Sequence, residues 1–277
     1  MNDLLSRADF AGKCVFVAGG SSGINLGIAE RFAEQGAKVA ICSRSPDRVA
    51  AAVETLKGHG GEAMGLPADV RHYDEVAAAL KAAADAFGAI DVLVSGAAGN
   101  FVAPALGMSA NAFKTVIDID LLGTFNVFRA GYDHLTRPGA SLIAISAPQA
   151  LHAYAYQAHV CAAKAGIDML VRTLAVEWGP DGIRVNSIIP GPIEDTEGMA
   201  RLAPTPEARQ RATEGVPLRR YGTKSEIGNA ALFLSSPMAA YITGAQLPVD
   251  GGATLSGAGR MGEAMALAFK EAAKAAR

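Results

Sequence analysis

The stretch VAGGSSGINLGIAERFAEQGAKV, residues 17–39, decides the fold. It follows the apolar run at 14–18 and leads into a second apolar run at 38–42. Gly19 and Gly23 permit a tight turn between strand and helix, in which the backbone can approach a pyrophosphate. The amides that begin the following helix would then face the negative charge. An ordinary strand–helix turn is the alternative, but a second strand about 20 residues on favours a dinucleotide-binding crossover.

Apolar runs alternate with helical patterns along most of the chain. Five runs are apolar enough to be strands covered on both faces. They lie at 14–18, 38–42, 91–95, 141–146 and 184–189. Amphipathic helices are expected between them, for example at 28–35, 74–87 and 165–179. This alternation predicts an α/β fold with a doubly wound parallel sheet. We expect residues 1–277 to form one Rossmann-like domain, with a core at about 10–252 and a helical tail at 260–277.

Composition and charge exclude several classes of function. The formal net charge of −2 predicts no basic face for nucleic acid. No segment approaches the roughly 18 apolar residues of a membrane span, and the N-terminus carries acids, which makes it a poor signal peptide. Cys14, Cys42 and Cys161 have no metal-like spacing, so we expect reduced thiols, a cytoplasmic location and no metal site.

The end of the second strand indicates which nicotinamide cofactor the chain binds. An acid there would bind the free 2′-hydroxyl of NAD, but the chain has Ser43 and Arg44. Arg44 and Arg48 lie within one helical turn of each other and could hold a 2′-phosphate by charge-assisted hydrogen bonds, which favours NADP(H). Solvated surface arginines are the alternative. Asp69 and Val70 end a further predicted strand and would border the adenine.

Asn25 is a departure from the glycine pattern of such loops. It stands where a third glycine is usual, and Gly27 follows two residues later. We interpret this as a shifted helix start that keeps the site, because backbone amides make most of the contact with a phosphate.

The chain resembles the short-chain dehydrogenase/reductase family through motifs that follow in order. They are GGSSGI (19–24), ADV (68–70), LVSGAAGNF (93–101), AVEWGPDGIRVNSIIPGPI (175–193) and TGAQLPVDGG (243–252). The resemblance implies that PGPI, at 190–193, meets the nicotinamide carboxamide. With the arguments above, it predicts a cofactor site formed by Gly19, Ser21, Ser22, Gly23, Ile24, Ser43, Arg44, Arg48, Asp69, Val70, Ser95, Ala97, Ala98, Lys164, Pro190, Gly191 and Ile193.

Three stretches narrow the resemblance within that family. AAGNF (97–101), NAFKTVIDIDLLGTFNVFRA (111–130) and TEGMARL (196–202) look like 2,4-dienoyl-CoA reductases of the peroxisomal type. This resemblance implies a conjugated acyl-CoA thioester as the substrate. Like most of the family, the chain would be a homotetramer, and apolar residues on several faces of the helices expected at 111–135 and 155–178 also predict self-association.

The family's usual acid is missing. Ala147 stands where an active-site serine is usual, and Val160 where a proton-donating tyrosine is usual. Ketone reduction needs an acid within reach of the alkoxide. Reduction of a dienoyl thioester instead spreads charge onto the thioester oxygen and ends with a proton delivered to carbon, which a held water could do. By resemblance, Lys164 would bind the nicotinamide ribose, and Asp120, in place of an asparagine, would orient that water.

The substrate side is less sharply defined. Asn100 and Phe101 follow a strand, in the crevice where such sheets bind ligands. Plain core packing is the alternative for Phe101. Four side chains just before Lys164 could supply a hydrogen-bond donor: Tyr154, Tyr156, Gln157 and His159. We predict substrate contacts from Asn100, Phe101, Tyr156 and Gln157. The segment 194–220, rich in Pro, Thr, Glu and Arg, predicts a lid beside the substrate.

Three functions stay open at this point. The first is NADPH-dependent reduction of 2,4-dienoyl-CoA in the oxidation of unsaturated fatty acids. The second is reduction of an enoyl thioester that lacks the distal double bond. The third is a cofactor-binding protein without catalysis, which Ala147, Val160 and Asn25 favour and which Asp120 and Lys164 oppose.

Overall fold

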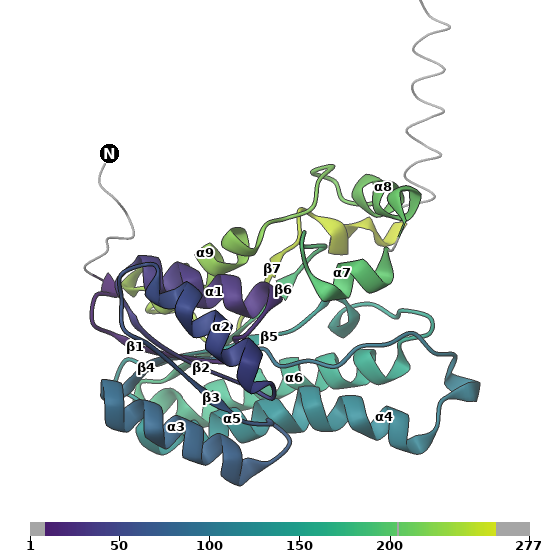
Figure 1. Ribbon diagram of the computed structural model, residues 1–277. Helices are drawn as coiled ribbons and strands as arrows, with labels where there is room; N and C mark the ends of the chain where they lie inside the picture. The colour runs from purple at the N-terminus through teal and green to yellow at the C-terminus, as the bar shows by residue number, and fades with distance from the viewer. Residues whose placement is uncertain (1–8, 204, 259–277) are drawn as a thin grey trace, which may run out of the picture.

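A computed structural model describes residues 9–203 and 205–258, in which a seven-stranded parallel sheet lies between two layers of helices (Figure 1). The strands are β1 Cys14–Ala18, β2 Lys38–Ser43, β3 Ala63–Pro67, β4 Ile90–Ser95, β5 Ser141–Ile145, β6 Arg184–Pro190 and β7 Gln246–Val249. The α-helices are α1 Gly23–Glu34, α2 Pro46–Lys57, α3 Tyr73–Phe87, α4 Ala110–Val116, α5 Gly123–Gly131, α6 Ala158–Trp178, α7 Glu197–Leu202, α8 Pro206–Glu214 and α9 Lys224–Ser235.

The strand order is β3-β2-β1-β4-β5-β6-β7. The chain therefore builds the sheet outward from β1 in one direction, then crosses back and continues from β4 in the other. Between β1 and β4 the connections leave toward opposite faces, which opens a crevice at the carboxyl ends of these strands. The doubly wound parallel α/β fold expected from the sequence is confirmed.

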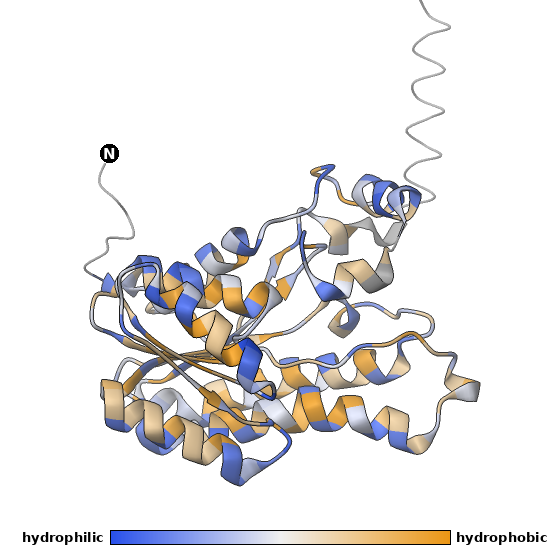
Figure 2. Cartoon of the chain, viewed as in Figure 1, coloured by the Kyte–Doolittle hydropathy of each residue, from blue (hydrophilic) through white to orange (hydrophobic). Residues whose placement is uncertain are grey.

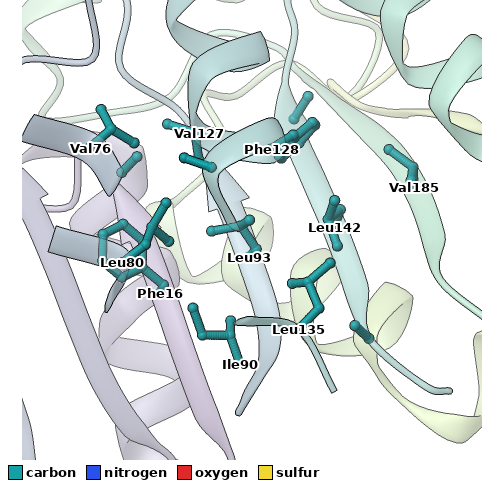
Figure 3. Packing of buried hydrophobic residues seen from close by; sticks show 14 of the residues in the cluster. Phe16, Val76, Leu80, Ile90, Leu93, Val127, Phe128, Leu135, Leu142 and Val185 are labelled. Atoms are coloured by element: carbon teal, nitrogen blue, oxygen red, sulfur yellow. The ribbon is translucent and has the colours of Figure 1, made fainter. Parts of the chain in front are cut away.

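Both faces of the sheet are covered by apolar side chains. Along β1, Phe16 packs with the residues of α3 and α5, whereas Val15 and Val17 pack with those of α1 and α9. Figure 3 shows the first cluster, in which Leu80 of α3 and Phe128 of α5 lie over the strands. In Figure 2 the helices alternate hydrophobic and hydrophilic residues, as expected of helices with one face on a core. This double burial explains why the central strands are continuous apolar runs.

The five predicted strands match β1, β2, β4, β5 and β6 to within one residue at each end. The sequence did not reveal the two edge strands clearly. β3 and β7 each contain a proline, Pro67 and Pro248, and are only partly buried. The strand expected to end at Asp69–Val70 ends at Pro67, so these two residues lie in the loop that follows.

Two helices begin earlier than the apolar periodicity indicated. Helix α1 starts at Gly23 instead of residue 28, and its first turn lines a cavity. Asn25 is therefore the third residue of α1, and the predicted shift of the helix start is wrong. Helix α6 starts at Ala158, earlier than the amphipathic pattern at 165–179 and three residues after the start of the helix expected at 155–178. The helical tail predicted at 260–277 lies outside the described residues.

The long helix expected at 111–135 is interrupted. Between α4 and α5 the chain forms a π-helical segment, Ile117–Leu122. A π-turn holds one more residue than an α-turn and recurs at functional sites. Here it turns Asp120 fully inward, while the neighbouring Leu122 is 41% exposed. None of the helices in the described ranges combines the length and apolar character that crossing a membrane requires.

Candidate active site

A cavity of about 680 Å³ opens at the carboxyl ends of the strands. Its walls come from the loops after β1, β2, β4, β5 and β6, and from α7, which stands apart from the two helical layers (Figure 1). Most of the predicted cofactor residues line it: Gly19, Ser21, Ser22, Gly23, Ile24, Ser43, Arg44, Arg48, Asp69, Val70, Ala97, Ala98, Lys164, Pro190, Gly191 and Ile193. Asn100 and Asp120 also line the cavity.

The loop after β1 is shaped to receive a phosphate. Gly19 and Gly23 have positive φ angles of 79° and 58°, which favour glycine. A Cβ on Gly19 would lie 2.8 Å from the nitrogen of Ala97, so only glycine lets these two loops meet. Ser22, the N-cap of α1, makes no side-chain cap, and the first turn holds no acid. The first amides of α1 therefore suit an anionic group of a cofactor.

Asn25 fastens this loop to the loop after β4. Its Nδ2 donates to the carbonyl of Gly96 at 2.7 Å. A Cβ on Gly96 would lie 2.0 Å from Asn25 Oδ1, so the amide occupies the space that a side chain at residue 96 would need. Position 25 thus carries a side chain where a glycine is usual, and the glycine at position 96 leaves the space for it. The glycine motif in the sequence indicated neither this contact nor its partner residue.

The wall expected to face the adenosine carries exposed arginines. Arg44 and Arg48 both line the wall, and Arg48 Nη1 lies 2.9 Å from Glu197 Oε1 of α7. Asp69 accepts hydrogen bonds from the guanidinium of Arg71, which holds the pKa of Asp69 below its ordinary value. Asp69 is therefore ionised at neutral pH, and its carboxylate is held by Arg71.

The predicted catalytic pair is a buried ion pair. Lys164 Nζ lies 3.2 Å from Asp120 Oδ2, and the two side chains are 7% and 0% exposed. Lys164 also donates to the carbonyl of Ile145, at the end of β5, at 3.0 Å. The second oxygen of Asp120 accepts the amide proton of Gly99 at 2.7 Å. Three elements, the π-helical segment, α6 and β5, thus meet at one ammonium group.

Ser95, predicted as a cofactor contact, lies behind the cavity wall and helps to hold Asp120 of the ion pair in place. Its side chain is buried, and its Oγ donates to Thr124 Oγ1, which in turn donates to the carbonyl of Asp120. Ser95 does not line the cavity, so its hydroxyl stabilises the π-helical segment.

The wall at the two substituted family positions is apolar. Ala147 and Val160 line the cavity, and Val160 is buried against Val116 and Ala163. Of the four possible donors before Lys164, Tyr154 is the one that lines the cavity. Partial burial raises the pKa of Tyr154 above its ordinary value, so its hydroxyl stays protonated at neutral pH.

Two further predicted substrate contacts tie the loop after β4 to the start of α6. Gln157 is buried and donates to Asn100 Oδ1 at 2.9 Å, while it accepts from Gln149 at 2.7 Å. The carbonyl of Tyr156, a residue with a φ of 66°, accepts the amide proton of Ala103. Neither Tyr156 nor Gln157 lines the cavity, whereas Gln149, which the sequence analysis did not select, does.

Phe101 covers a buried histidine. Its ring lies 4.2 Å from the ring of His159, centroid to centroid, and it is 37% exposed outside the cavity. His159 is fully buried. Burial lowers the pKa of His159 below its ordinary value of 6.5, against smaller opposite effects of Asp120 and of a hydrogen bond with the backbone of Phe101. The imidazole is therefore neutral at pH 7.

Comparison with known proteins agrees with this geometry. A family model described as "Enoyl-(Acyl carrier protein) reductase" matches residues 18–254. A protein of Pongo abelii, named peroxisomal 2,4-dienoyl-CoA reductase, (3E)-enoyl-CoA-producing, is 46% identical over 246 residues, which cover 88% of this chain and 84% of that protein. A protein of Bacillus subtilis, named probable 2,4-dienoyl-CoA reductase, (2E)-enoyl-CoA-producing, is 39% identical over 88% of this chain and 97% of its own length.

Solved structures share the fold. One of them is a blue fluorescent protein from a metagenomic library, in complex with NADPH. It has a TM-score of 0.81 and 29% identity, over 88% of this chain and 99% of that one.

The interlock of residues 25 and 96 gives a first prediction. Gly96→Ala should lower the free energy of unfolding by about 1–3 kcal/mol, because the new methyl group overlaps the Asn25 amide. It should also weaken binding of NADPH, since both loops line the cavity. Adding Asn25→Gly relieves the overlap but also removes the hydrogen bond to the Gly96 carbonyl, so the double variant should recover part of both losses.

Urea unfolding and NADPH titration of the three proteins measure this, with Gly179→Ala as the control, because a Cβ there meets nothing within 4 Å. A double variant as impaired as Gly96→Ala alone would contradict the interlock.

The buried imidazole gives a second prediction. The unfolded chain takes up a proton at His159 near pH 6.5, before the folded protein does, because burial lowers the folded pKa. This group therefore makes stability fall as the pH drops below 6.5 toward the folded pKa, by at most about 1.4 kcal/mol per pH unit. His159→Gln should flatten the dependence of the unfolding free energy on pH between 7.5 and 5.5. Parallel pH dependences for the variant and the unaltered protein would show that His159 is not the group.

Proposed function

We propose that this chain, which belongs to the short-chain dehydrogenase/reductase family, is an NADPH-dependent 2,4-dienoyl-CoA reductase. The observation that carries the proposal is the buried pair of Asp120 and Lys164 on a cavity wall that has alanine and valine at the family's acid positions. The names of the similar proteins from Pongo abelii and Bacillus subtilis support the same substrate class.

The cofactor assignment is supported by the chemistry of the cavity walls. The uncapped start of α1 suits a pyrophosphate, and the loop 190–193 lies on the nicotinamide side expected from the family resemblance. No acid ends β2, and Arg44 and Arg48 stand beside it, which favours a 2′-phosphate. When bound, NADPH supplies a hydride to the far end of the conjugated system.

Lys164 holds a fixed positive charge beside the reacting groups. Its ammonium donates to the Ile145 carbonyl at 3.0 Å and forms an ion pair with Asp120 Oδ2 at 3.2 Å. We assign a further N–H to a ribose hydroxyl of the cofactor, since Lys164 lines the cavity. Because Asp120 balances the charge of Lys164, hydrogen-bond donors have to stabilise the negative charge that develops on the thioester oxygen.

The thioester oxygen needs a hydrogen-bond donor. We assign this role to Tyr154, because it lines the cavity and its raised pKa keeps the hydroxyl protonated. Asn100, whose side-chain oxygen is engaged by Gln157, contributes the other polar group on that side.

Asp120 is the group we assign to proton delivery. Its two oxygens face the amide of Gly99 and the ammonium of Lys164, so the carboxylate is held in one orientation. From there it would orient a water that gives a proton to carbon, and the hydroxide left behind would take a proton from solvent. Ketone reduction is disfavoured, because neither Ala147 nor Val160 can protonate an alkoxide.

The proposal extends to assembly and location. Large apolar side chains are exposed along α4, the π-helical segment, α5 and α6: Phe113, Leu122, Phe125, Met169 and Val176. Pairing of these helices between subunits would cover them, which supports a homotetramer.

Light scattering tests this assembly. The measured mass should be about four times the 28.4 kDa of one chain, whereas a single-chain mass would contradict the homotetramer.

The three cysteines form no disulfide, which supports a reducing compartment such as the cytoplasm.

The reaction itself gives the central prediction. The protein should oxidise NADPH with a 2,4-dienoyl-CoA and not with a 3-ketoacyl-CoA. Asp120→Asn should lower kcat by about 10²–10⁴-fold, because the water loses the carboxylate that orients it. Lys164→Ala should lower kcat and also weaken NADPH binding.

Absorbance of NADPH follows each reaction. Asp118→Asn is the matched control, because Asp118 lies in the same π-helical segment but pairs with Lys114. Turnover of the ketoacyl substrate, or an unchanged kcat in Asp120→Asn, would contradict the mechanism. Turnover of an enoyl-CoA with one double bond would favour an enoyl-thioester reductase. Binding of NADPH without turnover of any thioester would favour a non-catalytic protein.

A further inference from the structure

We propose that Glu197 lowers the preference for NADPH over NADH, by competing with the 2′-phosphate for Arg48. This inference rests on the proposed cofactor site but not on the proposed substrate. It starts from the TEGMARL stretch at 196–202, to which neither the fold nor the proposed reaction assigns a role.

The two side chains meet across the cavity. Arg48 lies in the first turn of α2, directly after the strand end where the adenosine ribose is expected. Glu197 is the first residue of α7, on the opposite wall. Both line the 680 Å³ cavity, and Arg48 Nη1 lies 2.9 Å from Glu197 Oε1. The ion pair therefore spans the side of the cavity that a 2′-phosphate would enter.

Glu197 is positioned by the loop that precedes it. Thr196 Oγ1 donates to the carbonyl of Ile193 at 2.9 Å and accepts the amide proton of Met199, which caps α7. Ile193 belongs to the loop on the nicotinamide side. Residues 193–197 thus connect the loop expected to meet the nicotinamide with Arg48, the arginine expected to bind the 2′-phosphate.

The charges make the two partners of Arg48 mutually exclusive. A 2′-phosphate paired with Arg48 would bring its negative charge within a few ångströms of the Glu197 carboxylate, so one of the two must leave. The ion pair can be exchanged, because its side chains are 60% and 57% exposed and exposed pairs contribute little stability. A 2′-hydroxyl carries no charge and leaves the pair intact. Glu197 therefore penalises NADPH and spares NADH, and it reduces the preference that Arg44 and Arg48 create.

Isothermal titration calorimetry with NADP⁺ and NAD⁺, without any thioester, tests this. Glu197→Gln should tighten binding of NADP⁺ by about threefold to fivefold, the upper range of an exposed charge interaction. Binding of NAD⁺ should change less than twofold. In an Arg48→Ala background the same substitution should have less than half the effect on a logarithmic scale, because the contested partner is gone.

Glu177→Gln, an exposed glutamate on α6, controls for the change in net charge. Equal effects of Glu197→Gln on both cofactors, no effect on either, or the full effect in Arg48→Ala would each overturn the inference. Because no acyl-CoA is present, a selective shift would stand even if the protein did not reduce dienoyl-CoA. An enzyme that reduces dienoyl-CoA but lacks the shift would refute only the role of Glu197.

Discussion

The site depends on the need to compensate one buried cation. The ammonium of Lys164 is almost wholly withdrawn from solvent, and a buried charge that loses its partner is strongly destabilising. Its partners come from distant parts of the chain, the Ile145 carbonyl at the end of β5 and Asp120 in the π-helical segment. The departure from α-helical geometry between α4 and α5 is therefore part of the same requirement, since it turns Asp120 inward beside α6.

A carboxylate at position 120 changes the electrostatics that the family resemblance implies. With the usual asparagine, the lysine would be paired by a dipole, and a neighbouring phenol would gain from the uncompensated positive charge. Here Asp120 supplies a full negative charge and Val160 supplies no phenol. The two changes are consistent with each other. Asp120 neutralises the charge of Lys164, which therefore cannot activate a neighbouring acid, and no acid stands at position 160. The pair is left to hold ligands and water in place.

The sequence predicted the parts of the molecule that depend on local pattern. Strands buried on both faces are continuous apolar runs, and the glycine loop has its own signature, so both were located from the residues alone. Contacts between loops distant in sequence were not predictable. The bond from Asn25 to Gly96 joins residues 71 apart, and that from Gln157 to Asn100 residues 57 apart. Such contacts depend on how loops pack together at the carboxyl ends of the strands, and the hydrophobic periodicity of a sequence carries no information about this packing.

The surroundings of Val160 agree with the loss of the family's acid. Val160 is buried in a small cluster with Val116 and Ala163, directly beside the π-helical segment that carries Asp120. It also lines the cavity, as Ala147 does, so the wall next to the ion pair is apolar. An alkoxide formed against this wall would find no acid at either position. The apolar wall and the buried ion pair together favour chemistry in which the last proton goes to carbon and not to an alkoxide.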